Sequence, residues 1–245
     1  MLRYKIILEY DGTDFYGWQR QEKQISVQQV LEDALFVCTK EHPVLFAAGR
    51  TDTGVHATGQ VAHFDLEQQI DPFQLQGSLN ALVRPHKVCV KSAEIVSDEF
   101  HARFDAQKRR YIYKIQNTKY PPILNANRVC HFAMPLDENK MQEAANLLIG
   151  KHDFSTFRAS ECQAKSPIKT MDSITVKRVG DMIEIELIAR SFLHHQVRNI
   201  AGSLMWVGCG KWTVEDFKDA FDACDRRRGG PTAVPYGLYF MEVEY

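Results

Sequence analysis

The sequence of 245 residues lacks the features of secreted, metal-caged or membrane-spanning proteins. Its six cysteines are scattered and form no Cys-x-x-Cys pair, which argues against a zinc cage or a disulfide framework. We therefore expect free thiols, most of them buried, and a cytoplasmic protein. No apolar run approaches the roughly 20 residues that cross a bilayer. The apolar start, Met1–Leu8, is too short for a signal peptide, so no membrane partner is expected.

The common catalytic signatures are also missing. The sequence has no phosphate-binding P-loop, no Gly-x-Gly-x-x-Gly after a strand, no His-Glu-x-x-His helix and no Gly-x-Ser-x-Gly elbow. His194 and His195 are adjacent, so they cannot share one helical face as metal ligands at i and i+4 do. We expect this pair to be structural or to face RNA, and we predict no metal site and no organic cofactor.

No net charge of one sign marks a nucleic-acid binder, because 30 basic and 31 acidic residues nearly cancel. The local distribution is uneven, however. Residues 100–120 hold six basic residues and one acid, residues 187–212 hold no acid at all, and Arg226–Arg228 form a third basic cluster. Each cluster by itself also suits a solvated face. Together they would suit a basic track for RNA, if folding brings them to one side.

The hydrophobic pattern of the first half predicts the order β-α-β-β-α-β. Strands are expected at 2–10, 44–48, 57–66 and 88–96, because these runs are rich in β-forming residues. A helix with Ser26 as its N-cap is expected to reach Cys38, and a second helix should begin at Asp71-Pro72. This order is typical of the ferredoxin-like fold.

The second half repeats this pattern with one added helix. Strands are expected at 110–116, 170–179, 182–190 and 238–245, and helices at 136–149, 192–207 and 214–223. We predict an α+β fold of two ferredoxin-like units, an N-terminal one at 1–105 and a C-terminal one at 106–245. Their sheets would join edge to edge into one long antiparallel sheet, with helices on one face and a central catalytic cleft.

The loop Gly49–His56 places a carboxylate beside a guanidinium and between two glycines. Glycine lets the backbone turn tightly and approach a ligand closely, and Arg50 favours the ionised form of Asp52. Such a loop can hold one carboxylate at the floor of a cleft. The same spacing also suits a plain turn in which the Asp bonds its own backbone.

Two further segments combine charge with aromatic or apolar residues. Tyr111 follows Lys108, Arg109 and Arg110, a mixture that suits phosphate contacts together with base stacking. Packing of the tyrosine into a core is the alternative. Arg198 lies in an otherwise apolar helix and therefore predicts a charge partner, for which Asp52 is a candidate.

Taken together, these segments resemble the tRNA pseudouridine synthase A family. The resemblance runs in order from residue 4 to 245, and its most specific part is Gly49–Asp52. Its other pieces are Tyr10–Thr13, Gly17–Gln21, Gly54–Ala57, Gly59–Val61, Phe100–Phe104, Arg109–Tyr113, Phe192–Gly202 and Gly237–Tyr239. Thr53 replaces the alanine usual in the family, and Val83-Arg84-Pro85 stands where Leu-Pro is usual. Neither change removes a group that the chemistry needs.

The resemblance implies conversion of uridine to pseudouridine at positions 38, 39 and 40 of the tRNA anticodon stem-loop, by a homodimer without metal or cofactor. It implies that Asp52 is the nucleophile and that Arg50 and Arg198 bracket phosphate and carboxylate. Tyr111 would stack on the extruded uracil and assist proton transfer, and Leu238 would pack beside the base. Attack on ribose C1′ and attack on uracil C6 both stay open.

Two other functions fit the residues less completely. Ferredoxin-like units can also form a non-catalytic RNA-binding protein, in which case Asp52→Asn would leave RNA handling unchanged. A nucleoside or glycoside hydrolase using Asp52 would instead release free uracil or sugar.

Overall fold

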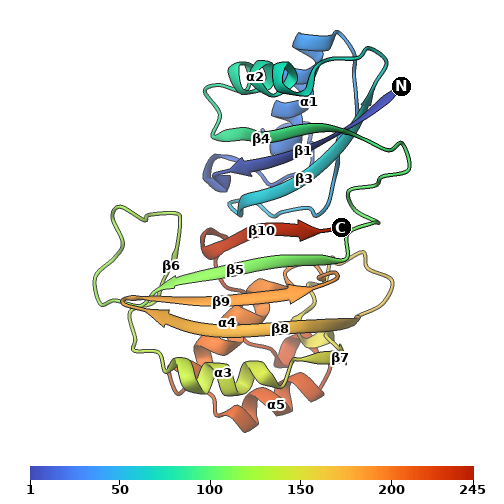
Figure 1. The fold of residues 1–245 in the computed structure, drawn as a ribbon. Coiled ribbons are helices and arrows are strands. Elements are labelled where there is room, and N and C mark those ends of the chain that lie inside the picture. Colours follow the sequence, from blue (N-terminus) through green and yellow to red (C-terminus); the bar gives the residue numbers. More distant parts are fainter. The chain divides into compact units, whose positions relative to one another are not determined.

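The computed structural model describes residues 1–245 and divides them into two compact units (Figure 1). The first unit comprises Met1–Gln107 and Phe240–Tyr245, and the second comprises Lys108–Tyr239. Each unit combines an antiparallel sheet with helices, so the predicted α+β class is confirmed. No helix in the chain has the length and apolar character that a membrane crossing requires.

The first unit follows the predicted β-α-β-β-α-β order. Its elements are β1 (Leu2–Tyr10), α1 (Val27–Thr39), β2 (Phe46–Ala47), β3 (His56–Leu66), α2 (Pro72–Leu82) and β4 (Val88–Val96). The strands lie in the order β4-β1-β3, with β2 also paired to β3, and the last strand, β10 (Leu238–Glu244), follows β3 in the sheet. The expected strand 44–48 is reduced to β2, where Phe46 and Ala47 lie in ladder register with β3, and the Ala48 amide donates one more bond to the Val61 carbonyl at 2.8 Å.

Local signals set the ends of both helices in this unit. The Ser26 hydroxyl accepts a hydrogen bond from the Gln29 amide and caps α1, and the Asp71 carboxylate caps α2 in the same way through Gln74. Alternate residues of β1, among them Tyr4, Ile6 and Leu8, are completely buried. Because alternate strand residues point to opposite faces, these side chains share one face of the sheet. Helices α1 and α2 pack against each other, and α2 packs on β4 (Figure 1).

The second unit is also built as a sheet with helices on one face. Its strands are β5 (Lys108–Gln116), β6 (Cys130–His131), β7 (Gly150–Asp153), β8 (Ile168–Val179) and β9 (Met182–Ala189), and its helices are α3 (Glu138–Asn146), α4 (Gln196–Gly208) and α5 (Val214–Asp222). The strand order is β5-β9-β8-β7, all antiparallel, while the short β6 pairs with β5 in parallel. Every second residue of β9 is buried, while α3 packs on β8, α4 packs on β5, and α5 packs on both of these helices.

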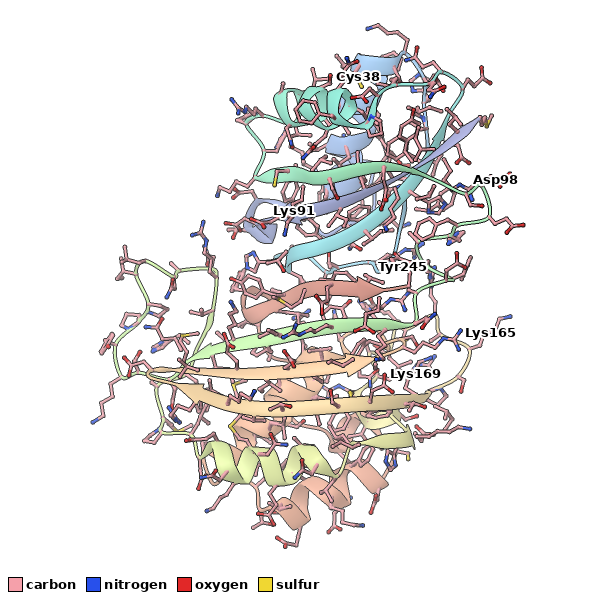
Figure 2. The ribbon with its side chains drawn as sticks, in the orientation of Figure 1. Cys38, Lys91, Asp98, Lys165, Lys169 and Tyr245 are labelled. Carbon is pink, nitrogen blue, oxygen red and sulfur yellow. The ribbon has the colours of Figure 1, made fainter.

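Two sequence predictions are wrong in this part of the description. The helix expected from Phe192 begins only at Gln196, because His195 before it has left-handed backbone angles (φ 60°, ψ 4°) that no α-helix accommodates. The cysteines are all free as expected, but only Cys130 is buried. Cys38 on α1, labelled in Figure 2, is half-buried, because it lies at the margin of the apolar face of that helix.

Candidate functional site

The loop between β2 and β3 presents Asp52 at the first position of a tight turn. The Val55 amide donates to the Asp52 carbonyl at 3.1 Å, and Gly54 between them has φ 78°. A positive φ at the third residue of a turn is the conformation that favours glycine. The main-chain carbonyl of Asp52 therefore closes the turn. The side chain of Asp52 is half-buried, and that of Arg50 on the same loop is exposed.

Hydrogen bonds from the sheet hold the residue before Asp52 in place. The hydroxyls of Tyr10 and Thr51 are 2.8 Å apart and both are buried. Gln60 donates to the Tyr10 hydroxyl at 3.4 Å and to the Gly49 carbonyl at 2.7 Å. Through these bonds, Tyr10 of β1 and Gln60 of β3 hold Gly49 and Thr51, the residues on either side of Arg50. The loop that carries Asp52 is therefore fixed at two points.

The segment that follows β1 closes over the same loop. The Trp18 amide donates to the Thr51 carbonyl at 3.0 Å. At Gly12, an added Cβ would lie only 2.0 Å from the Val55 carbonyl oxygen, and at Gly17, which has φ 83°, it would lie 2.6 Å from the Thr51 carbonyl oxygen. Both glycines are therefore required for the two segments to pack together.

Tyr10 remains a neutral hydrogen-bonding group in this arrangement. Burial raises the pKa of Tyr10 to about 12, and the hydrogen bonds from Thr51 and Gln60 offset that shift only in part. Its hydroxyl keeps its proton at neutral pH. Tyr10 thus has the properties of a fixed positioning group for the loop.

In the second unit, the residues expected to bind RNA lie on β5, and their side chains point to both faces of the sheet. Arg109 and Tyr111 are buried on the helix-covered face, since alternate strand residues point to opposite sides. Lys108 and Arg110 belong to the other face. Arg109 donates to the Arg190 carbonyl, and Arg110 forms an ion pair with Glu186. The Tyr111 ring meets Phe192 edge-on, with centroids 5.0 Å apart.

Arg198 lies in the first turn of α4 and is anchored to the segment before β10. Its Nε donates to the Ala233 carbonyl at 2.8 Å, and the Ala233 amide donates to the Arg198 carbonyl at 3.1 Å. The side chain of Arg198 is half-buried. The Nε bond fixes the plane of the guanidinium group and therefore the direction of its two Nη groups.

Leu238 begins β10 directly after the short helix Pro235–Gly237 and is buried, with 6% of its surface exposed. An added Cβ at Gly237 would lie 2.7 Å from the Lys114 carbonyl oxygen and 2.8 Å from the Tyr113 ring. The Tyr113 hydroxyl donates to the Val234 carbonyl at 2.7 Å. The turn that delivers Leu238 is thus packed tightly against β5.

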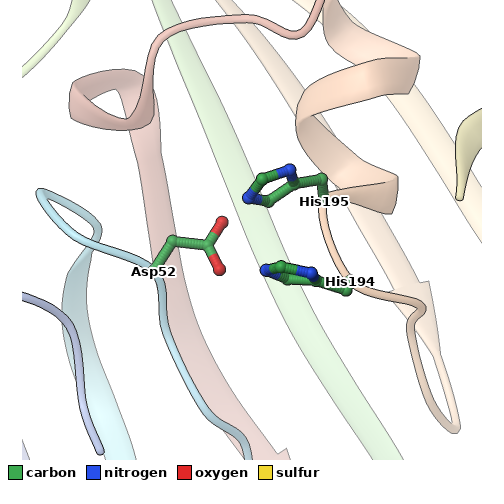
Figure 3. A group of neighbouring side chains, drawn as sticks. All are labelled: Asp52, His194 and His195. Atoms are coloured by element: carbon green, nitrogen blue, oxygen red, sulfur yellow. The ribbon is translucent and has the colours of Figure 1, made fainter. Parts of the chain in front are cut away.

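Figure 3 draws Asp52 together with His194 and His195. In the second unit, the two imidazoles lie next to each other just before α4, with ring centroids 4.0 Å apart. The backbone of His194 is bonded on both sides, to the Ala159 amide at 3.1 Å and to the Cys162 sulfur at 3.4 Å. Within neither unit alone do three His, Cys, Asp or Glu side chains converge as metal ligands would.

The structure thus brings Asp52 and Arg50 together on one loop of the first unit, while Tyr111, Arg198 and Leu238 belong to the second. The sequence analysis named Tyr10 and Gln60 only within motifs of the family resemblance and gave neither a role in holding these groups. Gln60 is one of several polar residues of β3, so its position in the strand does not by itself single it out. Its completely buried side chain needs hydrogen-bond partners, and it finds them at Gly49 and Tyr10.

Comparison with known proteins gives one consistent result. A family model described as tRNA pseudouridine synthase matches residues 6–105 and 144–245, which include the Asp52 loop, Arg198 and Leu238 but not Tyr111. A tRNA pseudouridine synthase A from Afipia carboxidovorans is 52% identical over 245 residues, with 100% of both chains covered. Proteins of the same name from Rhodospirillum rubrum and Bartonella tribocorum are each 49% identical over 100% of this chain, and cover 88% and 100% of their own length.

Proposed function

The chain belongs to the tRNA pseudouridine synthase family, and from this premise we propose that it isomerises uridine to pseudouridine at positions 38, 39 and 40 of the tRNA anticodon stem-loop. The observation that carries the proposal is the loop Gly49–His56. Its backbone is bonded to the Gln60 side chain of β3 and to the segment after β1, and its Thr51 hydroxyl is bonded to Tyr10 of β1. It presents one carboxylate, that of Asp52, from a fixed turn.

Asp52 is the nucleophile in this proposal. The reaction breaks the bond between N1 of uracil and C1′ of ribose, and forms a bond between C5 and C1′ after the base has turned. C5 loses a proton and N1 ends with one, so the product is an isomer of the substrate and no electrons are exchanged. A carboxylate can form the covalent intermediate that divides this exchange into two easier steps. The fixed turn supports this role, because it limits the positions that the attacking oxygen can take.

The remaining site residues bind and orient the nucleotide. Tyr111 stacks on the uracil after it has left the helix, which offsets a cost of a few kcal/mol for unstacking. Arg50 and Arg198 bind the phosphate and carboxylate groups, and Leu238 packs beside the base. The anchored Arg198 guanidinium and the tight turn before Leu238 support these assignments.

The RNA backbone is bound by Lys108, Arg109 and Arg110 in this proposal. Lys108 is exposed and reaches phosphate directly. Arg110 is ion-paired with Glu186, which partly neutralises its charge. The buried Arg109 acts indirectly, because it donates a hydrogen bond to the Arg190 carbonyl at the end of β9. The active form is a homodimer in the cytoplasm that uses neither metal nor organic cofactor, as the family resemblance implies.

The test is conversion of an unmodified tRNA transcript by the purified protein, mapped by carbodiimide-blocked primer extension. We expect new stops at positions 38–40 with the wild type and a loss of at least about 1000-fold in rate with Asp52→Asn, because the amide is not a nucleophile. Asp98→Asn is the matched control. Asp98 is an exposed carboxylate of the same unit (Figure 2) and its substitution should leave the rate unchanged.

Each alternative function gives a different result in the same assay. A hydrolase would release free uracil, measurable by chromatography, and would leave abasic sites in the tRNA. A non-catalytic RNA-binding protein would bind the tRNA equally well as wild type and as Asp52→Asn, without new stops in either case. Undiminished stops with Asp52→Asn would refute the nucleophile and leave the activity standing.

A further inference from the structure

The three consecutive arginines at the start of the segment Arg226–Ala233 differ sharply in their surroundings. Arg227 is exposed and pairs with Asp225, with a shortest distance of 2.6 Å, and Arg228 is exposed as well. Arg226 is half-buried, and burial lowers the pKa of its guanidinium group. A basic surface cluster predicted from the sequence therefore contains one arginine that points into the second unit.

The guanidinium of Arg226 is bonded to uncharged oxygens that lie against α4. Its Nη1 donates to the Gly230 carbonyl at 2.9 Å. Its Nη2 donates to the side-chain oxygens of Asn199 and Thr232, at 3.1 Å in both cases. This geometry uses the planar fork of arginine, which a lysine ammonium group cannot reproduce.

Asn199 is the point at which these bonds meet. Its side chain is buried, with 1% of its surface exposed, and both of its polar atoms are satisfied. Oδ1 accepts from Arg226 and from the Thr232 hydroxyl at 2.7 Å, while Nδ2 donates to the Phe157 carbonyl at 2.9 Å. Asn199 thus connects helix α4 with the segment Arg226–Ala233 on one side and, on the other, with Phe157 in the connection between β7 and β8.

The main chain of the same segment packs closely on α4. The Gly230 amide donates to the Ser203 hydroxyl at 3.0 Å, and that hydroxyl donates to the Asn199 carbonyl at 2.8 Å. An added Cβ at Gly202 would lie 1.8 Å from the Pro231 carbonyl oxygen. The main chain from Gly230 to Ala233 is therefore held directly on the backbone of the helix.

We propose that Arg226 and Asn199 are positioning residues for Arg198. They fix Thr232, and the next residue, Ala233, supplies the carbonyl that receives the Arg198 Nε–H. If that carbonyl moves, the plane of the Arg198 guanidinium turns with it. This inference rests on the proposed function of Arg198 in binding the substrate and adds the residues that orient it.

The test is a double-mutant cycle between Arg226 and Arg198, measured as kcat and KM for tRNA conversion. Arg226→Gln and Arg226→Lys should both lower kcat by about 10-fold, because small displacements of a positioned group reduce rates strongly. Since Arg226 acts through Arg198, adding Arg226→Gln to Arg198→Ala should lower kcat less than 2-fold further. Restoration of wild-type rates by Arg226→Lys would overturn the proposal, because a direct phosphate contact needs only the charge.

Arg178 provides a matched control in the same unit. It too is half-buried, and it donates to Glu138, Asn117 and the Leu136 carbonyl, away from Arg198. Arg178→Gln should lower the melting temperature about as much as Arg226→Gln and leave kcat within 2-fold. An equal loss of kcat in both variants would mean that Arg226 contributes only to stability, and would overturn the proposal.

The cycle separates failure of this inference from failure of the proposed function. If Arg198→Ala retains wild-type kcat and KM, the assigned role of Arg198 is wrong and the positioning role falls with it. If Arg198→Ala is impaired while Arg226→Gln is not, or if the two losses multiply, only the positioning role is wrong. Thermal unfolding of each variant shows whether the fold is retained. Thr232→Val is a second variant, which removes the two bonds of the Thr232 hydroxyl to Arg226 and Asn199 with a smaller change in volume.

Discussion

Tyr4 and Tyr10 of β1 are both buried and both form hydrogen bonds through their hydroxyls, but they bond different segments of the chain. The Tyr4 hydroxyl bonds the main chain of Ile70, donating at 2.9 Å and accepting at 2.8 Å. The Tyr10 hydroxyl bonds Thr51, next to Asp52. Position along a single strand thus separates a tyrosine that fixes a connection before α2 from one that fixes the loop carrying the proposed nucleophile.

We therefore predict different outcomes for Tyr10→Phe and Tyr4→Phe. Each loses one buried hydroxyl and should lower the free energy of unfolding by about 1 kcal/mol. Only Tyr10→Phe should also lower kcat for tRNA conversion, by about 10-fold, because it releases Thr51. Urea unfolding and the primer-extension assay measure the two quantities, and an equal kcat in both variants would contradict the role of Tyr10.

The loop Gly49–His56 and the segment after β1 pack as one structural element, although the contacting residues Gly12 and Val55 lie 43 positions apart in the chain. Their contact depends on Gly12, where an added Cβ would lie 2.0 Å from the Val55 carbonyl oxygen. No side chain can enter this space without moving the backbone of the loop. The close approach therefore transmits any change in the segment after β1 to the turn at Asp52.

Gly12→Ala should lower the free energy of unfolding by about 1–3 kcal/mol, the usual cost of overpacking, and should reduce conversion of tRNA. Gly77→Ala is its control. Gly77 is exposed in the interior of α2 with no atom within 4 Å of an added Cβ, so alanine should raise the free energy of unfolding by about 0.5–1 kcal/mol. Chemical denaturation of both variants measures the difference, and loss of stability in Gly77→Ala would contradict this account.

For the molecule as a whole, stability in mild acid depends on a histidine buried in the first unit. The His63 Nδ1 accepts from the Ala102 amide at 3.2 Å, and its ring stacks on Phe46 with centroids 5.2 Å apart. Burial, and next the neighbouring His101 and Arg3, lower the pKa of His63 from 6.5 to about 4, against the opposing effect of Asp65. His63 is therefore neutral in the folded protein at pH values where it is charged in the unfolded chain.

Between pH 6.5 and pH 4 the unfolded state binds the additional proton, so stability falls as the pH falls through this window. The slope from His63 should reach at most about 1.4 kcal/mol per pH unit. The lowered pKa of Asp65, from 3.8, acts only at lower pH. In His63→Asn, where the amide oxygen can accept from Ala102, unfolding in urea should become less dependent on pH in this range. His42→Asn, at an exposed site, should retain the dependence, and a wild-type slope in His63→Asn would contradict the assignment.

The sequence did not indicate the short strands β6 and β7 of the second unit. By itself it determined the α+β class, the order of elements in the first unit, that of the longer elements in the second unit, and the helix starts at Ser26 and Asp71. These follow from local rules, namely the spacing of apolar residues and the side chains that can bond a free amide. It also placed Asp52 on a glycine-bounded loop. The motif and the family resemblance were sufficient to place Asp52, because a specific run of residues can be identified without knowing which distant segments contact it.

Only the tertiary structure decided what surrounds these residues. The start of α4 depends on the left-handed backbone of His195, which carries no local signal such as a glycine. The basic cluster Arg226–Arg228 looks uniform in the sequence, yet one of its members turns inward, because Asn199 and Thr232 lie within reach of it alone. The bond between Tyr10 and Thr51 joins residues 41 positions apart. Such contacts arise from the packing of distant segments, and no local pattern specifies them.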